Sequence, residues 1–409
     1  MAIVSARLPR MDGMEHQPDE PPEVPLGDVL GDVPLFREIQ RVLLSSPGPI
    51  NWELARQVGI AMASWGTDDP VPTAQDQRGL ADTVRMAELA IADFTSLPFP
   101  TDVAEVGAVR RAQWVEANVS ALPPLLDPVA VKLAEAMKGL QGGAEPMPPG
   151  MEGSAELLQM VMGRMVPLLF GAQVGSALGY LGQRVLGQYD LALPRPTGSV
   201  LFVVPNIARF EREWSLEPRE FRAWVALHEV THRFEFAQPW VRGHFVGLVT
   251  DLFEHAEVDL SSLERRLEGM DISNPEALAD LTEGMGNLFG EASDGEQRLR
   301  IARVQAFMAA AEGYGDHVME GLGRKMLTSV SQIEEALRRF REGRPADRAL
   351  EQLLGLEMKI EQYRQGKAFC ARVSELTDEA TLARMWGSPD SLPSMPELEE
   401  PTLWLARMA

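Results

Sequence analysis

An H-E-x-x-H pentapeptide, which spans His228 to His232, constrains this chain more than any other feature. On a helix, histidines four residues apart lie one turn apart on the same face. Both imidazoles can then bind one tetrahedral zinc ion. Glu229, next to the first histidine, can accept a proton from a water on that metal. The pentapeptide therefore predicts His228 and His232 as metal ligands and Glu229 as the catalytic base.

The residues on either side of the pentapeptide predict a helix over about 217–237. Ser215 is expected to cap its N-terminus, and Pro218 suits its first turn. Apolar residues then recur at helical spacing until Pro239, which cannot continue a helix. Glu235 lies on the same stripe as the two histidines.

The alternative to a metal site is a chance pair of histidines. The chain contains only six histidines, so a pair at this spacing is not expected from composition. The residues from Trp224 to Leu227 are apolar, which predicts that the two rings are largely buried. Buried polar rings need partners, and a metal ion supplies one.

A β-rich run at 200–207 precedes this helix. It predicts a strand along the active-site cleft, and an edge strand near 201–206 can pair with an extended peptide. The remaining pattern is mostly helical. The sequence therefore predicts a mainly α fold with a small β element next to the H-E-x-x-H helix.

Zinc in a catalytic site needs a third protein ligand and one position left for water. The extended metzincin pattern is excluded, because Glu235 and Gln238 stand where it requires glycine and histidine. Glu312 is the preferred ligand, since a lone carboxylate in the apolar helical run 303–319 is costly unless it is paired or bound to a metal. The alternatives are Glu254, Glu257, His244, His255 and His317.

Three neighbours of Glu312 are expected to assist at the site. Asp316, one helical turn later, can accept the free N–H of a ligating imidazole. His317 and Tyr314 can stabilise the oxyanion, although His317 can equally be a satisfied core histidine. The glycines between them lack side chains, so this helix can pass close to the histidine helix.

Composition limits the partners and the compartment. The net charge of −22 argues against nucleic-acid binding, which needs a basic surface, and it disfavours anionic membranes. The single cysteine, Cys370, excludes an intrachain disulfide and is expected in the core. Residues 1–23 are polar and acidic and do not resemble a signal peptide. We therefore expect a cytoplasmic protein.

One uncharged segment, 165–182, has two interpretations. Gly171, Gly175 and Gly179 recur at every fourth position, which suits close helix packing in a membrane or in a protein core. Polar residues and a proline lower its hydrophobicity, and its length is at the lower limit for a span. Packing in a core is therefore the favoured interpretation.

The chain divides into four predicted parts. These are a flexible acidic and proline-rich tail (1–34), an N-terminal helical lobe (35–140), a catalytic region (151–385) and a C-terminal tail that wraps the surface (386–409). The expected helices are 36–45, 51–64, 76–95, 103–121, 127–140, 241–258, 259–270, 275–290, 296–322, 333–341 and 347–364, and a long helix or broken pair is expected after 150, to about 187. The proline- and glycine-rich run 141–150 reads as the loop between lobes.

Several stretches together resemble the type 2 family of zincin-like metallopeptidases found in actinobacteria and chloroflexi. The similar stretches are Asn51–Gln57, Val185–Asp190, Val204–Ile207, Trp224–His232, Pro239–Arg242, Glu312–Val318, Leu354–Lys359 and Gln362–Gly366. Some members are labelled as associated with deazaflavin-coenzyme biosynthesis. The E-x-x-x-D spacing of Glu312 and Asp316 also resembles the second zinc motif of CAAX-protease-like zincins.

The resemblance implies a mainly helical zincin fold, with His228 and His232 as zinc ligands and Glu229 as acid and base. It implies no particular substrate. The favoured hypothesis is a zinc metallopeptidase, similar to gluzincins, that acts on a peptide or protein. One alternative is a zinc hydrolase for small amides or esters, and another is a binding protein with a vestigial metal site. Oligomeric state does not follow from the sequence.

Overall fold

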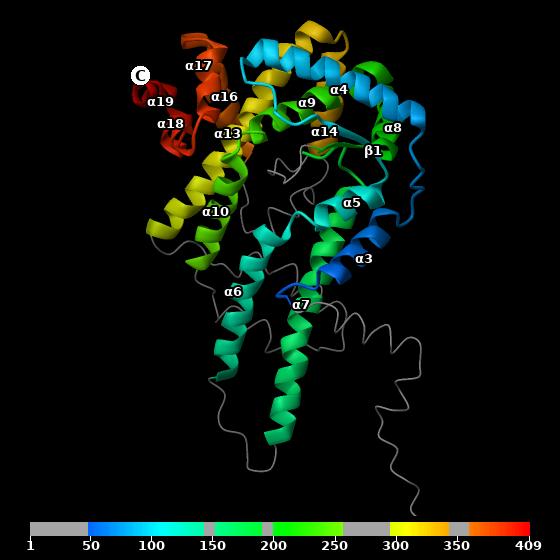
Figure 1. The fold of residues 1–409 in the computed structure, drawn as a ribbon, viewed down its shortest axis with the longest axis vertical. Helices are drawn as coiled ribbons and strands as arrows, with labels where there is room; N and C mark the ends of the chain where they lie inside the picture. The colour runs from blue at the N-terminus through cyan, green and yellow to red at the C-terminus, as the bar shows by residue number, and fades with distance from the viewer. Residues whose placement is uncertain (1–47, 143–151, 190–198, 257–294, 343–359) are drawn as a thin grey trace, which may run out of the picture. The chain divides into compact units, whose positions relative to one another are not determined.

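The computed structural model describes residues 48–142, 152–189, 199–256, 295–342 and 360–409, and the fold is mainly α, as predicted (Figure 1). The helices are α3 (Trp52–Ala63), α4 (Ala74–Thr95), α5 (Arg111–Val119), α6 (Pro123–Gly142), α7 (Glu152–Gly182), α8 (Val204–Glu213), α9 (Pro218–Phe236), α10 (Val241–Glu254), α13 (Gly295–Met326), α14 (Val330–Glu342), α16 (Ile360–Leu376), α17 (Glu379–Ala383), α18 (Met395–Glu399) and α19 (Pro401–Met408). The strands are β1 (Glu105–Val109) and β2 (Ser199–Val203).

The two strands form a small parallel sheet, in which Glu105 pairs with Ser199 and Val109 with Val203. The outer edge of β1 is covered by Gln77 of α4, whose amide accepts from Ala108 N (2.8 Å) and donates to Val106 O (2.6 Å). The side-chain amide thereby takes the place of a third strand's peptide group.

The far edge of β2 contacts another segment at its C-terminal end. Phe202 forms an antiparallel bridge with Gly187, and the Val203 amide donates to Leu186 O (2.9 Å). The pairing of a peptide with an edge strand near 201–206 stays a prediction, and these contacts limit it, because they occupy the far edge of β2 at Phe202 and Val203.

Two segments differ from the sequence-based expectation. The helix expected over 103–121 is strand β1 followed by α5. The strand expected over 200–207 ends at Val203, and α8 follows it with Pro205 in its first turn. In both cases the strand is fixed by pairing with a partner far away in the chain, which a local pattern does not contain.

The glycine stripe of 165–182 packs against α3. A Cβ on Gly175 would lie 2.5 Å from the Ala55 carbonyl oxygen, and one on Gly171 would overlap the Asn51 carbonyl. These contacts confirm close helix packing as the use of the stripe. Among the residues that the structure describes, none of the helices is both long and apolar enough to span a membrane.

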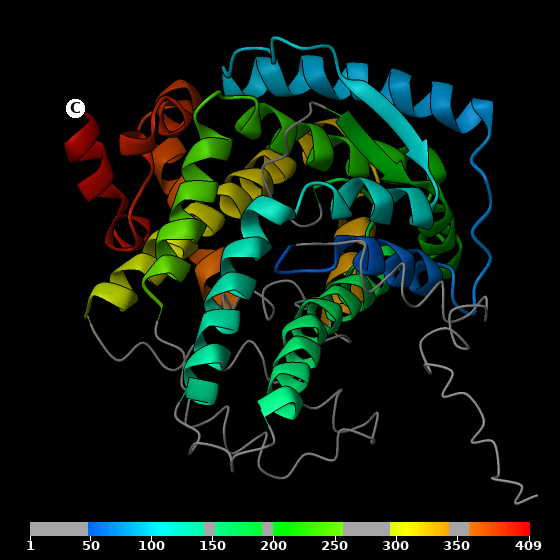
Figure 2. The ribbon, with the colours of Figure 1, turned by 60° about the horizontal axis from the view of Figure 1, so that its bottom comes forward.

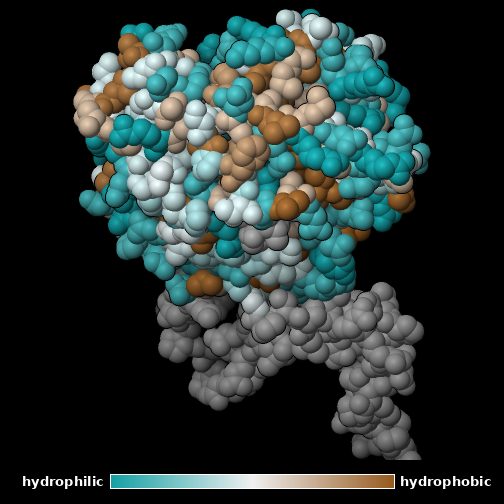
Figure 3. All heavy atoms as spheres, turned by 45° about the horizontal axis from the view of Figure 1, so that its top comes forward, coloured by the Kyte–Doolittle hydropathy of each residue, from teal (hydrophilic) through white to brown (hydrophobic). Residues whose placement is uncertain are grey.

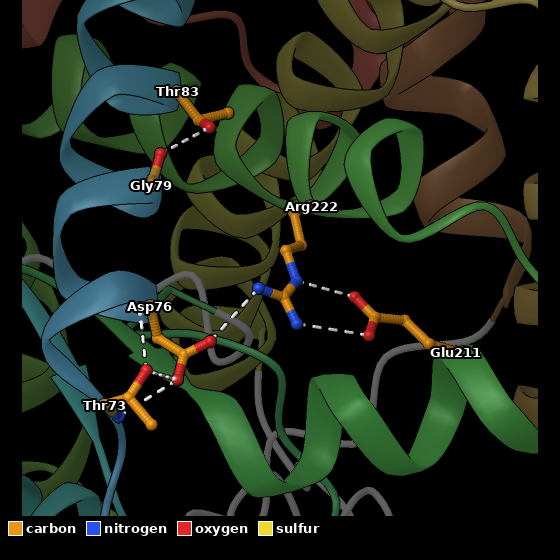
Figure 4. Close-up of polar contacts among 6 residues, drawn as sticks. All are labelled: Thr73, Asp76, Gly79, Thr83, Glu211 and Arg222. Atoms are coloured by element: carbon orange, nitrogen blue, oxygen red, sulfur yellow. Dashed lines mark hydrogen bonds and ion pairs between the residues drawn. The ribbon is translucent and has the colours of Figure 1, made fainter.

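Helix α9 begins later than its sequence suggests. Glu217, not Ser215, is the N-cap, and its side chain accepts from Glu220 N (2.7 Å). Ser215 instead has a positive φ of 53° in the turn before it. Arg222 then ties this first turn to Glu211 of α8 and Asp76 of α4, at 2.8 and 3.2 Å (Figure 4).

Helices from the two predicted lobes are in direct contact. α3 packs on α7, and α4 runs along α9, as Figure 2 also shows. The boundary near 141–150 and the four-part division stay predictions. The tail 1–34 and the expected helices 36–45, 259–270 and 275–290 lie outside the described residues.

The C-terminal segment forms α18 and α19, which pack on α16. Trp404 of α19 is fully buried against Phe369. On the face that Figure 3 shows, hydrophobic residues are scattered among hydrophilic ones.

Helix α13 lies in the core between α9 and α16. Gly313 faces Gly366 of α16, and a Cβ on Gly366 would overlap the Ala309 carbonyl. Backbone cannot move aside as a flexible side chain can, so these two helices need glycine at their crossing.

We expect Gly366→Ala to lower the free energy of unfolding by about 1–3 kcal/mol or more, the usual cost of overpacking. Denaturant unfolding of the full chain measures the change. Gly247→Ala in α10 is the control, since nothing lies within 4 Å of a Cβ there. Equal unfolding midpoints for the two variants would contradict the helix crossing described above.

Candidate metal centre

Helix α9 places both histidines of the pentapeptide on one face. The centroids of the His228 and His232 rings are 4.7 Å apart, and the rings are nearly perpendicular at 87°. His228 is half-buried and stacks on Trp224, with the centroids 6.0 Å apart. His232 is fully buried. The predicted burial therefore holds fully for the second ring and only in part for the first.

The His232 ring is held in a defined orientation. Its Nδ1 is 2.9 Å from Oε2 of Glu235, which is also fully buried. Its Nε2 is buried without a hydrogen-bond partner among the described residues. A buried nitrogen left in this way needs a partner, and a metal ion is one that suits a neutral imidazole.

Several carboxylates surround this imidazole. Burial acts to lower the pKa of His232, but the charge and hydrogen bond of Glu235 and the charges of Glu312 and Glu229 raise it to about 9. Burial raises the pKa of Glu235, and His232 opposes that rise. The site therefore favours a positive charge at His232, whether a proton or a metal ion on Nε2.

Glu229 is fully buried, and its Oε2 accepts a hydrogen bond from the Tyr189 amide (2.6 Å). The chain just before Tyr189 lies directly against this carboxylate, because a Cβ on Gly187 would overlap it. Gly187 is fixed in turn by its bridge to β2 and by Trp114, whose Nε1 donates to its carbonyl (2.8 Å). The small sheet thus positions the segment that holds Glu229.

Helix α13 brings Glu312 toward the histidine helix. Gly315 lies against the His232 ring, since a Cβ there would be 3.1 Å from Cε1. Glu312 is half-buried three residues earlier, close enough for its charge to raise the pKa of His232. The expected close approach of this helix through its glycines is therefore found at Gly315.

The other predicted neighbours lie away from His232. Asp316 is exposed. The sequence suggested that Asp316 would contact a ligating imidazole, but at His232 that contact is made by Glu235. His317 is half-buried, with Nε2 2.9 Å from Glu379 of α17. His317 thus has a carboxylate partner of its own, and an oxyanion role for it stays a prediction.

Tyr314 is fully buried, with its ring against Trp386. Burial and the charge of Glu235 raise its pKa well above the usual value, so the phenol stays protonated. Tyr314 thus lies near the carboxylate that holds His232.

The alternative third ligands lie elsewhere. Glu254 and His255 are exposed at the end of α10, and His255 is 3.3 Å from Asp251. His244 is half-buried between Trp240 and Phe307. Glu257 is outside the described residues. Of the described candidates Glu312 and Glu254, it is Glu312 whose charge acts on His232.

The residue types fit zinc, although the side chains do not already form a complete coordination site. In the described parts of the chain, no three His, Cys, Asp or Glu side chains already form a metal-binding group. Two imidazoles and a carboxylate are nonetheless the usual set for catalytic zinc. The buried Nε2 of His232 is the atom that such an ion would satisfy.

Comparison with known proteins identifies the family. The family described as zincin-like metallopeptidase matches residues 50–405. A crystal structure from Chloroflexus aurantiacus, described as "a putative hydrolase with a novel fold", shares 33% sequence identity at a TM-score of 0.61 and covers 88% of this chain and 98% of its own. No curated protein matches. The chain therefore belongs to the zincin-like metallopeptidase family, which indicates a hydrolase and confirms the resemblance found in the sequence.

No role was predicted for Gly187 or Tyr189, and the contact of Glu235 with His232 was not predicted either. The first two occur in a stretch that resembles the family, which is the one signal that marks them. Their contacts with Glu229 depend on the tertiary fold and have no local pattern.

Proposed function

We propose that the protein is a zinc-dependent metallopeptidase, with His228, His232 and Glu312 as metal ligands and Glu229 as the catalytic base. The observation that carries the proposal is His232, whose Nε2 is buried without a hydrogen-bond partner in the described structure while Nδ1 is held by Glu235. Metal-ligating histidines usually have this arrangement. The family match supports the hydrolase class.

The chain's own residues divide the chemistry between them. Bound zinc would supply a Lewis acid that polarises the scissile carbonyl and acidifies water. Glu229, held at Oε2 by the Tyr189 amide, accepts the proton of the attacking water and passes it to the leaving amine. Burial of Glu229 and His232 excludes bulk water and strengthens the electrostatic interactions between them.

Burial of the site also favours a second candidate, hydrolysis of a small amide or ester. Glu229 and His232 are both fully buried, whereas an extended peptide needs an open cleft. A matched set of peptides and small amides or esters, assayed with the zinc-loaded full chain, separates the two candidates.

Metal content tests the proposed site. We expect stoichiometric zinc in the wild-type chain, loss of zinc in His232→Ala, and zinc affinity at least about tenfold weaker in Glu312→Ala, since a ligand is lost. Elemental analysis and chelator competition measure these values. Glu254→Ala is the control, because Glu254 is exposed at the end of α10. Full zinc occupancy in Glu312→Ala, with loss in Glu254→Ala, would move the third ligand to α10.

A further inference from the structure

Glu235 is a buried carboxylate to which the proposed catalytic cycle gives no task. It follows His232 by three residues on α9, and both side chains are fully buried. Its Oε2 lies 2.9 Å from Nδ1 of His232, and its Oε1 is buried without a hydrogen-bond partner in the described structure. A carboxylate in such surroundings is expensive to bury.

Stability alone does not account for this pair. A buried ion pair often stabilises a fold no more than apolar residues of the same volume would, because both groups lose their hydration. The pair also leaves the second nitrogen of His232 unsatisfied. A purely structural contact therefore leaves Nε2 of His232 without a partner, whereas a metal ion at that atom supplies one.

The packing around His232 leaves its ring a defined position. Phe236 stacks on it with the centroids 5.7 Å apart and an interplanar angle of 14°, and Tyr189 lies 6.2 Å away. Gly315 of α13 comes close to its edge. With the ring so confined, the partner of Nδ1 decides which nitrogen carries the hydrogen.

We infer that Glu235 is a positioning residue, which accepts the Nδ1–H of His232 and thereby presents a deprotonated Nε2 to the metal. The inference rests on the proposed function, because it requires zinc at His232. A carboxylate in this role also makes the imidazole a stronger ligand. Glu235 thus performs at His232 the task that the sequence had suggested for Asp316.

Two substitutions separate the hydrogen bond from the charge. Glu235→Gln keeps an oxygen that can accept Nδ1–H but removes the charge, whereas Glu235→Leu removes both at similar volume. We expect the dissociation constant of zinc to rise about tenfold in the first and about 100-fold in the second, the usual range for such partners. Chelator competition on the full chain measures it.

The control is Glu211→Gln. Glu211 is also a buried carboxylate, but it pairs with Arg222 and not with a histidine. Its loss should leave zinc affinity within twofold of wild type. In the zinc-loaded wild type, ¹⁵N NMR should show a hydrogen on Nδ1 of His232 and none on Nε2, whereas a merely structural ion pair would keep the hydrogen on Nε2.

Unchanged zinc affinity in folded Glu235→Gln and Glu235→Leu would overturn the inference and leave the zinc site standing. A hydrogen on Nε2 of zinc-loaded His232 would overturn it as well. A wild-type chain that binds no zinc would instead remove the proposed function, and the inference with it. If Glu235→Leu does not fold, Glu235→Gln alone decides.

Discussion

Glu229→Gln should abolish hydrolysis while zinc stays bound. The amide cannot accept a proton from the attacking water, and loss of a general base lowers rates by about 10²–10⁴-fold. Glutamine has the same shape as glutamate, and its oxygen can still accept the Tyr189 amide that holds Oε2 in the wild type. The substitution therefore changes the chemistry and leaves the local packing in place. The turnover number and zinc content of the full chain measure the two effects separately.

Glu211→Gln is a suitable control for this experiment too, because it removes a buried carboxylate whose partner, Arg222, lies near the start of α9 and before the pentapeptide. Its turnover number should equal that of wild type. Activity within tenfold of wild type in Glu229→Gln would exclude Glu229 as the base. Loss of zinc in that variant would show instead that the carboxylate helps to hold the metal.

The central helix of the site could be predicted from sequence because its signals are local. The i, i+4 spacing of His228 and His232, the apolar stripe and the proline after it all occur within one continuous segment. The structure places both rings on one face of α9, close to the expected bounds. Only its N-cap moved, because Ser215 adopts a positive φ in the preceding turn.

The sheet could not be predicted with the same success. β1 and β2 are five residues each and pair across a long sequence separation. The 103–121 segment is rich in helix-forming residues after β1, so its local pattern favours a single helix. Gln77 also completes the edge of β1 with a side chain, and no sequence pattern marks such a contact.

Long-range contacts also explain what the sequence missed at the site. Glu312 and Asp316 share a helical face, which suggested a ligand and its orienting partner on α13. In the structure Gly315 is the residue that contacts His232, and Asp316, the next residue, is exposed. Asp316 therefore does not follow Glu312 toward α9. Glu235 lies on the histidine helix itself, and its place on the stripe of the two histidines was predicted, but the stripe alone does not show which atom of His232 it contacts.

Gly187→Ala should lower the turnover number by about 100-fold, the size of effect that a misplacement of about 1 Å produces. A Cβ at this position overlaps the carboxylate of Glu229, which is the far end of a flexible side chain. The carboxylate can move aside, so the added methyl group should displace the base without unfolding the protein. Zinc content should remain that of wild type, because Gly187 makes this contact with Glu229 and not with a proposed ligand.

Gly187→Ala thus differs from Gly366→Ala, where the obstacle is backbone and the cost falls on folding. Gly79→Ala is the matched control for activity, because nothing lies within 4 Å of a Cβ at that position on α4. Turnover, zinc content and the unfolding midpoint should be measured for all three variants. Wild-type turnover in a folded Gly187→Ala would mean that Glu229 works from another position than the one fixed by Tyr189. If Gly187→Ala loses both its turnover and its folded structure, the 185–189 segment stabilises the core and does not only position Glu229.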